Sequence, residues 1–258
     1  MYVFPMAGLS RRFTEAGYTV PKFMLPAGPM NLFQHSIHGF REAFETESFL
    51  FIYLGATCSD AFILDSAAAI GLRPENVRLA RLDQPTDGQA TTVAEGLAVA
   101  GVSVDEPLTI FNIDTIYSDF AQPDFSGRGP VDGYLDVFVG EGTHWSFVRP
   151  KIEGERLGEA IEVTEKIRIS NLCSSGLYHF ARAGSFMKEF DAIRSRSVHE
   201  LQGNERYIAP LYNAMIQKGQ TVYYRVIRSD SIQFSGTPAE YHRFLADNGY
   251  PENAPPVG

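Results

Sequence analysis

MYVFPMAGLSRRFTEAGYTVPK, residues 1–22, starts with an apolar run and continues into a turn of small residues. The apolar run, residues 1–6, predicts a short buried strand that ends at the turn over residues 8–10. A small-residue turn after a strand exposes backbone N–H groups to an anion, and Arg12 and Lys22 add two positive charges. The stretch therefore predicts a phosphate-binding loop, although it matches neither the GxGxxG nor the GxxxxGK pattern.

Strands and helices alternate over the first half of the chain, as in βαβ units. Residues 31–44 carry apolar side chains at helical spacing and predict an amphipathic helix. Further strands are expected over residues 49–55, 77–82 and 107–113, and further helices over 59–70 and 91–100. Asp114 ends the last of these strands, where a parallel sheet presents its carboxyl edge to a ligand. We therefore expect a site at that edge.

The pattern changes after Pro123, where short strands follow one another without intervening helices. Antiparallel strands are expected over residues 133–139, 144–148, 160–165 and 176–180, then helices over 183–193 and 206–218, a strand over 221–227 and a closing helix over 238–248. No repeat or low-complexity linker marks a boundary, so we expect a single domain over residues 1–250. The tail, residues 251–258, holds three prolines and is expected to be disordered.

Composition narrows the class of protein. The chain has 258 residues, 44% of them hydrophobic, which is enough to bury a substantial core. A net charge of −9 without any basic run argues against a nucleic-acid polymer or a membrane as partner. Cys58 and Cys173 lack metal-binding spacing, which favours a reducing, cytoplasmic location. The sequence shows no leader pattern and no apolar run of about 18 residues, so a soluble protein is expected.

The first loop resembles the signature loop of the sugar-phosphate nucleotidyltransferases, or NDP-sugar pyrophosphorylases, especially the short enzymes of capsular and surface polysaccharide pathways. The matching residues, in type and spacing, are Ala7, Gly8, Ser10, Arg12, Phe13, Pro21 and Lys22. Ser10 is one departure, since most members have glycine there. The resemblance implies an α/β fold: a Rossmann-like three-layer α/β/α sandwich with a mixed, mainly parallel sheet, similar to the GT-A fold.

The resemblance also implies roles for individual residues. Arg12 would bind the β- and γ-phosphates and Lys22 would neutralise charge at the α-phosphate, so both are expected to be catalytic. Residues 84–90 resemble the segment that faces the nucleobase, although they also suit an ordinary turn. The expected nucleotide-binding residues are Ala7, Gly8, Leu9, Ser10, Gln84 and Gly88.

Asp114 resembles the metal-binding aspartate of the family, and Mg²⁺ prefers a carboxylate when it also bridges phosphate oxygens. A strand-end turn or a helix cap is the other interpretation of Asp114. The second carboxylate of the family lies in an Asp-x-Gly-Thr-Pro segment, but here Phe234 takes the aspartate's place before Ser-Gly-Thr-Pro. A phenylalanine cannot bind a metal, so Asp230, or else Gln233, is the candidate for the second ligand.

Other positions resemble the family's contacts with the second substrate. Glu165 and Lys166 stand where the family has a glutamate that holds sugar hydroxyls and a lysine that contacts phosphate, although such pairs are common on surfaces. Trp145, the only tryptophan, lies in a glycine-rich turn beside the expected sugar position, where it either stacks on the sugar or simply packs. By the resemblance, Trp145, Glu165, Lys166 and Gly176 bind this substrate.

Together these features predict a Mg²⁺-dependent nucleotidyltransferase. It would join a nucleoside triphosphate to a sugar 1-phosphate or similar small phosphorylated substrate and release pyrophosphate, for surface polysaccharide synthesis. A GT-A-like glycosyltransferase is an alternative, since it shares the sheet and the strand-end aspartate, but the loop of Arg12 and Lys22 argues against it. A non-catalytic nucleotide-binding regulator would explain Phe234. The nucleobase and the acceptor stay open, and a homo-oligomer is compatible with the sequence.

Overall fold

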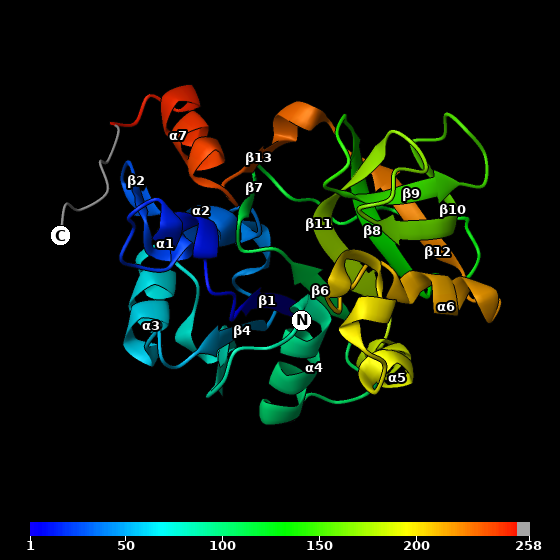
Figure 1. The fold of residues 1–258 in the computed structure, drawn as a ribbon, viewed down its shortest axis with the longest axis horizontal. Helices are drawn as coiled ribbons and strands as arrows, with labels where there is room; N and C mark the ends of the chain where they lie inside the picture. The colour runs from blue at the N-terminus through cyan, green and yellow to red at the C-terminus, as the bar shows by residue number, and fades with distance from the viewer. Residues whose placement is uncertain (252–258) are drawn as a thin grey trace. The chain divides into compact units, whose positions relative to one another are not determined.

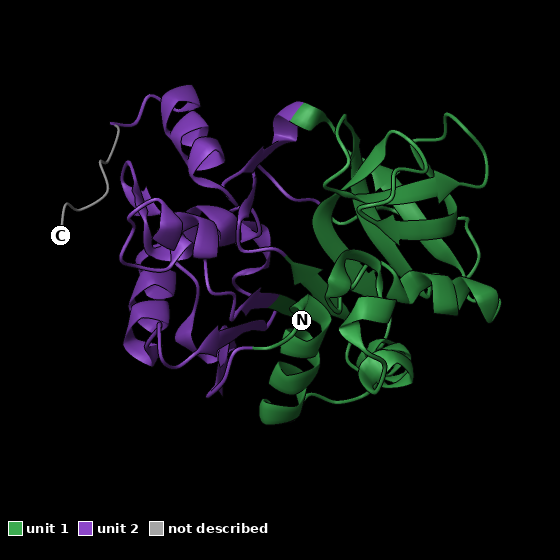
Figure 2. Cartoon of the chain, viewed as in Figure 1, with its two compact units in different colours: residues 1–3, 86–111, 122–229 green, residues 4–85, 112–121, 230–258 purple. Residues whose placement is uncertain are grey.

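The computed structural model describes residues 1–251, so the expected disordered tail, apart from Pro251, lies outside the described residues. The chain divides into two compact units, each assembled from segments that are distant in sequence (Figure 2). Unit 1 consists of Met1–Val3, Thr86–Phe111 and Gln122–Ser229, and unit 2 of Phe4–Pro85, Asn112–Ala121 and the residues from Asp230 onward. The expectation of one domain over residues 1–250 stays a prediction.

Unit 2 contains strands β5 (Val77–Leu82) and β4 (Phe49–Leu54) and most of β1 (Tyr2–Met6), in the sheet order β5–β4–β1. β4 and β5 pair in parallel, from Phe49 opposite Val77 to Leu54 opposite Leu82. Every residue of β4 is buried, as expected of a parallel strand covered on both faces. Burial on both faces explains why its sequence, FLFIYL, is apolar throughout instead of alternating.

The helices of unit 2 are α1 (Arg11–Glu15), α2 (Leu32–His38), α3 (Asp60–Ala69) and α7 (Pro238–Asp247) (Figure 1). The unit also has two short antiparallel strand pairs. One joins β2 (Pro26–Ala27) with β3 (Met30–Asn31), and the other joins β7 (Thr115–Tyr117) with β13 (Ile232–Phe234). A buried cluster holds α1 and α7 together, because Phe13 of α1 packs against Tyr241 of α7 at a ring-centroid distance of 6.3 Å. The short helix α1 is thus anchored by one apolar side chain.

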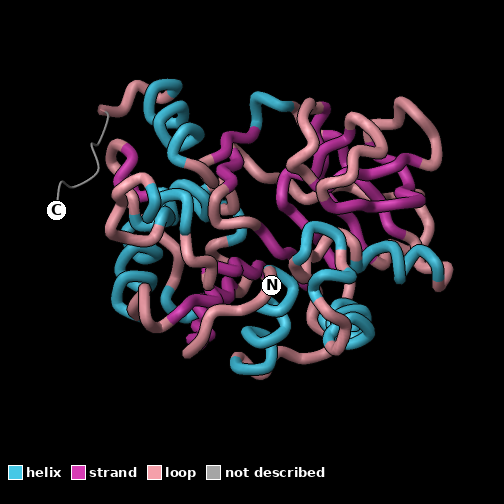
Figure 3. The backbone as a smooth tube through the Cα atoms, in the orientation of Figure 1, coloured by secondary structure: helices cyan, strands magenta, loops and turns pink. Residues whose placement is uncertain are grey.

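Unit 1 contains β6 (Leu108–Phe111), β11 (Leu172–Phe180), β8 (Gly133–Val139), β12 (Val222–Val226), β10 (Leu157–Glu165) and β9 (Ser146–Pro150), in that sheet order. Its helices are α4 (Gln89–Val99), α5 (Ala183–Arg194) and α6 (Leu211–Gln217) (Figures 1 and 3). β9 also pairs with β11, through Phe147 opposite Cys173. The strands β11, β8, β12, β10 and β9 therefore close into a five-stranded ring.

The α/β fold and the mixed sheet are confirmed, but the expectation of a mainly parallel sheet is wrong. In the described residues, parallel pairing joins β1 to β6, β4 to β5 and β8 to β12, whereas β11 is antiparallel to three strands and β10 to two. One cause is the short connection between β9 and β10, which pair with each other. Parallel neighbours would need crossovers of a dozen or more residues.

Two of the predicted helices differ from their expected extent. The helix expected over residues 31–44 ends at His38, and a 3₁₀ turn, Arg41–Ala43, follows. Gly39 lies close against Tyr117, and its carbonyl oxygen accepts the N–H of Phe120 at 2.9 Å instead of continuing the helix. The helix expected from residue 206 begins at Leu211, after Pro210. Proline disfavours a helical conformation in the residue before it, which explains the late start.

None of the helices in the described part of the chain is both long and apolar enough to cross a lipid bilayer.

Candidate functional site

The loop between β1 and α1 has an open and slightly strained backbone. Ser10 adopts a left-handed conformation, with φ of 50°, and its carbonyl oxygen accepts hydrogen bonds from the N–H groups of Phe13 and Thr14. A left-handed conformation costs a residue with a side chain about 1–2 kcal/mol, which explains why glycine would suit this position. No atom lies within 4 Å of a Cβ placed on Gly8, so the backbone there is open to a ligand.

The predicted cations differ in their surroundings. Arg12 lies on the exposed face of α1, and none of the described carboxylates forms an ion pair with it. Lys22 begins the 3₁₀ turn Lys22–Met24, and its backbone N–H donates to the hydroxyl oxygen of Ser10 at 3.3 Å. This hydrogen bond ties the proline-lysine segment to the first loop.

Lys22 and Asp114 form an ion pair. The Nζ of Lys22 lies 2.5 Å from Oδ2 of Asp114, and both side chains are mostly buried, with exposed fractions of 21% and 28%. Asp114 lies between β6 and β7, so 92 residues of sequence separate the partners. The sequence predicted a role for each residue but gave no indication of their contact.

The Gly-Thr-Pro segment lies directly against Asp114. β13 pairs with β7, placing Phe234 opposite Thr115, and Ser235 then donates its N–H and its hydroxyl to the backbone oxygen of Asp114 at 2.8 and 3.2 Å. A Cβ placed on Gly236 would lie 2.8 Å from Oδ2 of Asp114. The glycine therefore leaves room beside this carboxylate that any other residue would fill.

A second carboxylate, which no sequence motif indicated, approaches the same place. Oε2 of Glu240 lies 3.4 Å from the position of that Gly236 Cβ. Glu240 lies in the first turn of α7, where its backbone N–H donates to the hydroxyl oxygen of Thr237 at 3.2 Å. In the sequence, the spacing of Thr237 and Glu240 indicates a helix cap, and nothing there points to a ligand-binding role for Glu240.

Asp230 lies exposed in the 3₁₀ turn Ser229–Ser231, and its role as second metal ligand stays a prediction. Within residues 1–251 there is no group of three or more histidine, cysteine, aspartate or glutamate residues suited to hold a metal ion by itself. Mg²⁺ commonly binds one or two carboxylates and completes its shell with water and substrate phosphates. The carboxylates of Asp114 and Glu240 fit this requirement.

In the segment predicted to face the nucleobase, Gly88 is required by the fold. It has φ of 153° and caps the start of α4, and a Cβ there would lie 2.5 Å from the backbone nitrogen of Arg206. The N–H of Ala90 donates to the backbone oxygen of Arg206 at 2.8 Å. Gln84 is exposed after β5. Nucleotide binding by Gln84 and Gly88 stays a prediction.

Arg206 organises this segment, and no sequence pattern indicated it. Its side chain, 9% exposed, forms an ion pair with Asp87. The same guanidinium donates to the backbone oxygens of Arg194 and Arg196, at 2.9 and 2.6 Å. Its Nε is buried without a partner among the described residues. Arg206 thus holds residues 87–90 to the loop after α5.

Glu165, at the end of β10, is a buried carboxylate. The hydroxyl of Ser146 donates to it, and its own backbone N–H donates to Oε1 of Gln202 at 2.7 Å. Burial raises the pKa of Glu165, while the Ser146 hydrogen bond and the charge of Lys166 oppose that rise. Glu165 is therefore not a surface charge, and its binding of the second substrate stays a prediction.

Lys166 and the tryptophan turn lie beside Glu165. Lys166 adopts a left-handed conformation, its Nζ donates to the hydroxyl of Tyr207 at 2.5 Å, and burial raises the pKa of Tyr207. Trp145 accepts the N–H of Lys166 at its backbone oxygen and donates its indole N–H to the oxygen of Glu141, both at 2.9 Å. Trp145, Glu165 and Lys166 therefore form one cluster within unit 1.

Gly176 contributes through the backbone. It has φ of 89° and lies in β11 where the register against β8 shifts between Ser174 and Tyr178. This irregularity is a β-bulge, which re-aims neighbouring side chains. The phenolic oxygen of Tyr178, just beyond the bulge, lies 3.3 Å from the hydroxyl of Ser146, the residue that bonds Glu165. Substrate contact by Gly176 itself stays a prediction.

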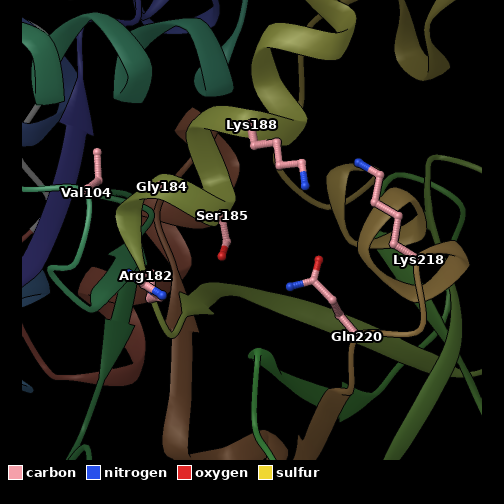
Figure 4. A pocket seen from close by; sticks show the side chains of 7 residues that line it. All are labelled: Val104, Arg182, Gly184, Ser185, Lys188, Lys218 and Gln220. Carbon is pink, nitrogen blue, oxygen red and sulfur yellow. The ribbon is translucent and has the colours of Figure 1, made fainter.

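A cavity of about 390 Å³ in unit 1 contains none of the predicted site residues. Its lining consists of Val104, Arg182, Gly184, Ser185, Lys188, Lys218 and Gln220 (Figure 4). Its positive charges are largely compensated, because Arg182 pairs with Asp105 and Lys218 pairs with the buried Glu189 at 2.5 Å. The cavity is therefore a poor candidate for the site.

Solved structures match the chain over nearly its whole length. The nucleoside-diphosphate-sugar pyrophosphorylase of Vibrio cholerae RC9 is 42% identical, with a TM-score of 0.87 over 95% of this chain and 100% of that chain. Two more distant structures share the fold. The UDP-glucose pyrophosphorylase of Acinetobacter baumannii is 18% identical, with a TM-score of 0.66 over 96% of this chain and 92% of that chain. The inositol-1-phosphate CTP transferase of T. maritima is 11% identical, with a TM-score of 0.66 over 97% of this chain and 97% of that chain. No protein-family model and no curated protein matches the sequence.

Proposed function

Because this chain belongs to the nucleoside-diphosphate-sugar pyrophosphorylases, a family of nucleotidyltransferases, we propose that it transfers a nucleoside monophosphate from its triphosphate to a sugar 1-phosphate or similar small phosphorylated substrate. A phosphate oxygen of this substrate would attack the α-phosphorus, and pyrophosphate would leave. The contact of Lys22 with Asp114 is the observation that carries the proposal, since it joins the phosphate loop to the strand-end carboxylate.

The residues of unit 2 would act on the triphosphate. The open backbone at Gly8 and the neighbouring residues Ala7, Leu9 and Ser10 would receive phosphate oxygens. Arg12, exposed and without an ion-pair partner among the described carboxylates, would neutralise the departing pyrophosphate. Lys22 would stabilise the crowded α-phosphate, and such pre-organised charges typically contribute about 10²- to 10³-fold each to the rate. Phosphoryl chemistry needs positioning and charge more than a protein nucleophile.

Mg²⁺ fits the carboxylate oxygens beside Gly236. Asp114 would hold the ion, whose contribution is to neutralise charge on the phosphate oxygens. The ion pair of Lys22 with Oδ2 of Asp114 supports this assignment, because it places one positive charge against this carboxylate. The chain's own residues otherwise supply the orientation of the substrates.

The residues of unit 1 would act on the acceptor. Glu165 would accept hydrogen bonds from sugar hydroxyls, and its orientation is fixed by Ser146 and Gln202. Lys166 would contact the acceptor phosphate after leaving the hydroxyl of Tyr207. The indole of Trp145 would pack against the sugar, with its N–H fixed by Glu141.

Finer features also belong to this proposal. We propose a Rossmann-like three-layer arrangement of helices around the sheet, a role in surface polysaccharide precursor synthesis, and a homo-oligomeric state. A cytoplasmic location is supported by the two free, buried thiols of Cys58 and Cys173, as expected in a reducing compartment.

Pyrophosphate release tests the function. Each nucleoside triphosphate is combined with Mg²⁺ and with a panel of sugar 1-phosphates and phosphocholine, and Lys22→Ala serves as the blank. Release from one combination, absent in the blank, supports the proposal and identifies both substrates. If every combination is inactive while nucleotide hydrolysis or glycosyl transfer from a nucleotide sugar is detected, a glycosyltransferase replaces it. Nucleotide binding without any turnover supports the regulatory alternative.

A further inference from the structure

Glu240 is a carboxylate with no evident structural task. No described donor or cation forms a hydrogen bond or ion pair with its side chain, although it is half-buried. Its backbone N–H, not its carboxylate, makes the cap contact with Thr237. In a full capping box the glutamate side chain would also return to the backbone of the cap residue, as Gln34 does at Asn31 in α2. The Glu240 carboxylate does not contribute in this way.

Asp114 and Glu240 face one small space. Oδ2 of Asp114 and Oε2 of Glu240 lie 2.8 and 3.4 Å from the Cβ position of Gly236, which has no side chain to fill it. A cation beside Gly236 would be attracted by both carboxylates. Lys22 neutralises Asp114 alone, so one negative charge remains uncompensated.

The position of Phe234 explains why a replacement ligand is needed. Its backbone is fixed opposite Thr115 by the pairing of β13 with β7, so the strand carries an apolar side chain where a carboxylate would bind metal. Glu240 follows in the next element and approaches from α7. Its longer side chain can cover the distance by rotation or through one water, since Mg²⁺ usually keeps several waters.

We propose that Glu240, instead of Asp230, supplies the second carboxylate for the divalent cation at Asp114. The identity of the cation rests on the proposed function, whereas the existence of the cation site does not. Asp114 and Glu240 would hold the ion beside Gly236, and Lys22 would be released from Asp114 to contact phosphate.

Binding of Mn²⁺ alone, followed by electron paramagnetic resonance of the free ion, tests this assignment without turnover. Glu240→Gln should weaken Mn²⁺ binding at least about 10-fold, as loss of groups around a metal typically does. Asp114→Asn should weaken it by a similar factor. Asp247→Asn is the matched control, because it removes one carboxylate from the exposed end of the same helix and should leave binding unchanged.

The outcomes separate the two proposals. Unchanged Mn²⁺ affinity in Glu240→Gln, with weaker binding in Asp230→Asn, would overturn the assignment of Glu240. If Glu240→Gln binds Mn²⁺ more weakly but the wild-type chain releases no pyrophosphate, the metal site is supported and the proposed function is rejected. Thermal unfolding of each variant shows whether the fold is intact, and the glutamine keeps the backbone contact with Thr237.

Discussion

Lys22 and Asp114 are joined by a 2.5 Å ion pair, although 92 residues of sequence separate them. Both side chains retain some solvent exposure, so the pair contributes no more than about 1 kcal/mol to folding. The pair matters mainly for the geometry of the site, because it brings together an ammonium group and a carboxylate from two segments far apart in sequence.

Replacing Lys22 with alanine should abolish most turnover while the fold persists. We expect a loss of about 100-fold or more in kcat, because a charge facing the transition state disappears. Unfolding should shift by less than about 1 kcal/mol. Lys151→Ala is the matched control, since Lys151 forms an equally short ion pair with Glu159 on the exposed surface. Normal turnover in Lys22→Ala would contradict the catalytic role.

Asp114→Asn should raise the Mg²⁺ concentration that gives half-maximal rate by at least about 10-fold. Asparagine keeps the shape and the backbone oxygen that binds Ser235, so the loop should stay in place. The measurement is the rate of pyrophosphate release across a Mg²⁺ titration. An unchanged midpoint would remove Asp114 as a metal ligand.

Gly236→Ala should impair metal binding more than folding. The new methyl group would lie 2.8 Å from Oδ2 of Asp114, closer than a methyl group and an oxygen tolerate, and would fill the space between the two carboxylates. We expect a higher half-maximal Mg²⁺ concentration with a small change in melting temperature. Gly129→Ala is the control, because no atom lies within 4 Å of its Cβ position. Equal effects of both changes would argue against a cation site beside Gly236.

Arg206→Met should loosen the segment that carries Gly88. The change removes the ion-pair partner of Asp87 and leaves two backbone oxygens without this donor, at a cost of about 2 kcal/mol. The KM for the nucleotide should rise more than kcat falls, since the arginine positions the segment without touching the reacting phosphates. Arg194→Met, on an exposed side chain, should leave both quantities near wild type. A pure stability loss with unchanged KM would limit Arg206 to folding.

Glu165→Gln should stabilise the protein and weaken acceptor binding. Burial raises the pKa of Glu165, so the folded state retains its proton above the ordinary carboxyl pKa of about 4.3. The free energy of unfolding therefore falls as the pH rises through this window, and the glutamine variant lacks that fall. The excess free energy of unfolding of Glu165→Gln over wild type, measured by chemical denaturation, should be largest at pH 7–8 and should shrink toward pH 4. Glu162→Gln, exposed on the same strand, should show no such pH-dependent advantage.

Local patterns predicted most elements because each depends on neighbouring residues. The buried strand β4 followed from its continuous apolar run, and α3 from an apolar pattern that begins after the capping residue Ser59. The helix expected over residues 31–44 was too long: it ends before Gly39, where Phe120 approaches and donates its N–H to the Gly39 carbonyl oxygen. Such an approach leaves no periodic pattern in the sequence.

The candidate site was predicted as separate parts. Motif spacing indicated Arg12, Lys22 and Asp114, since an anion-binding loop and a strand-end carboxylate are local features. Glu240 and Arg206 were missed. Glu240 fits a helix-cap pattern equally well, and the importance of Arg206 arises from its contacts with Asp87 and with the carbonyls of Arg194 and Arg196.

The sequence by itself determined the α/β class, the order of the elements and the small-residue turn of the first loop, because periodicity and turn chemistry act over a few residues. Tertiary structure alone decided the contact of Lys22 with Asp114, the closure of β9 onto β11 and the space at Gly236. These features join segments far apart in the chain. Their geometry is set by packing and strand pairing, which no local pattern encodes.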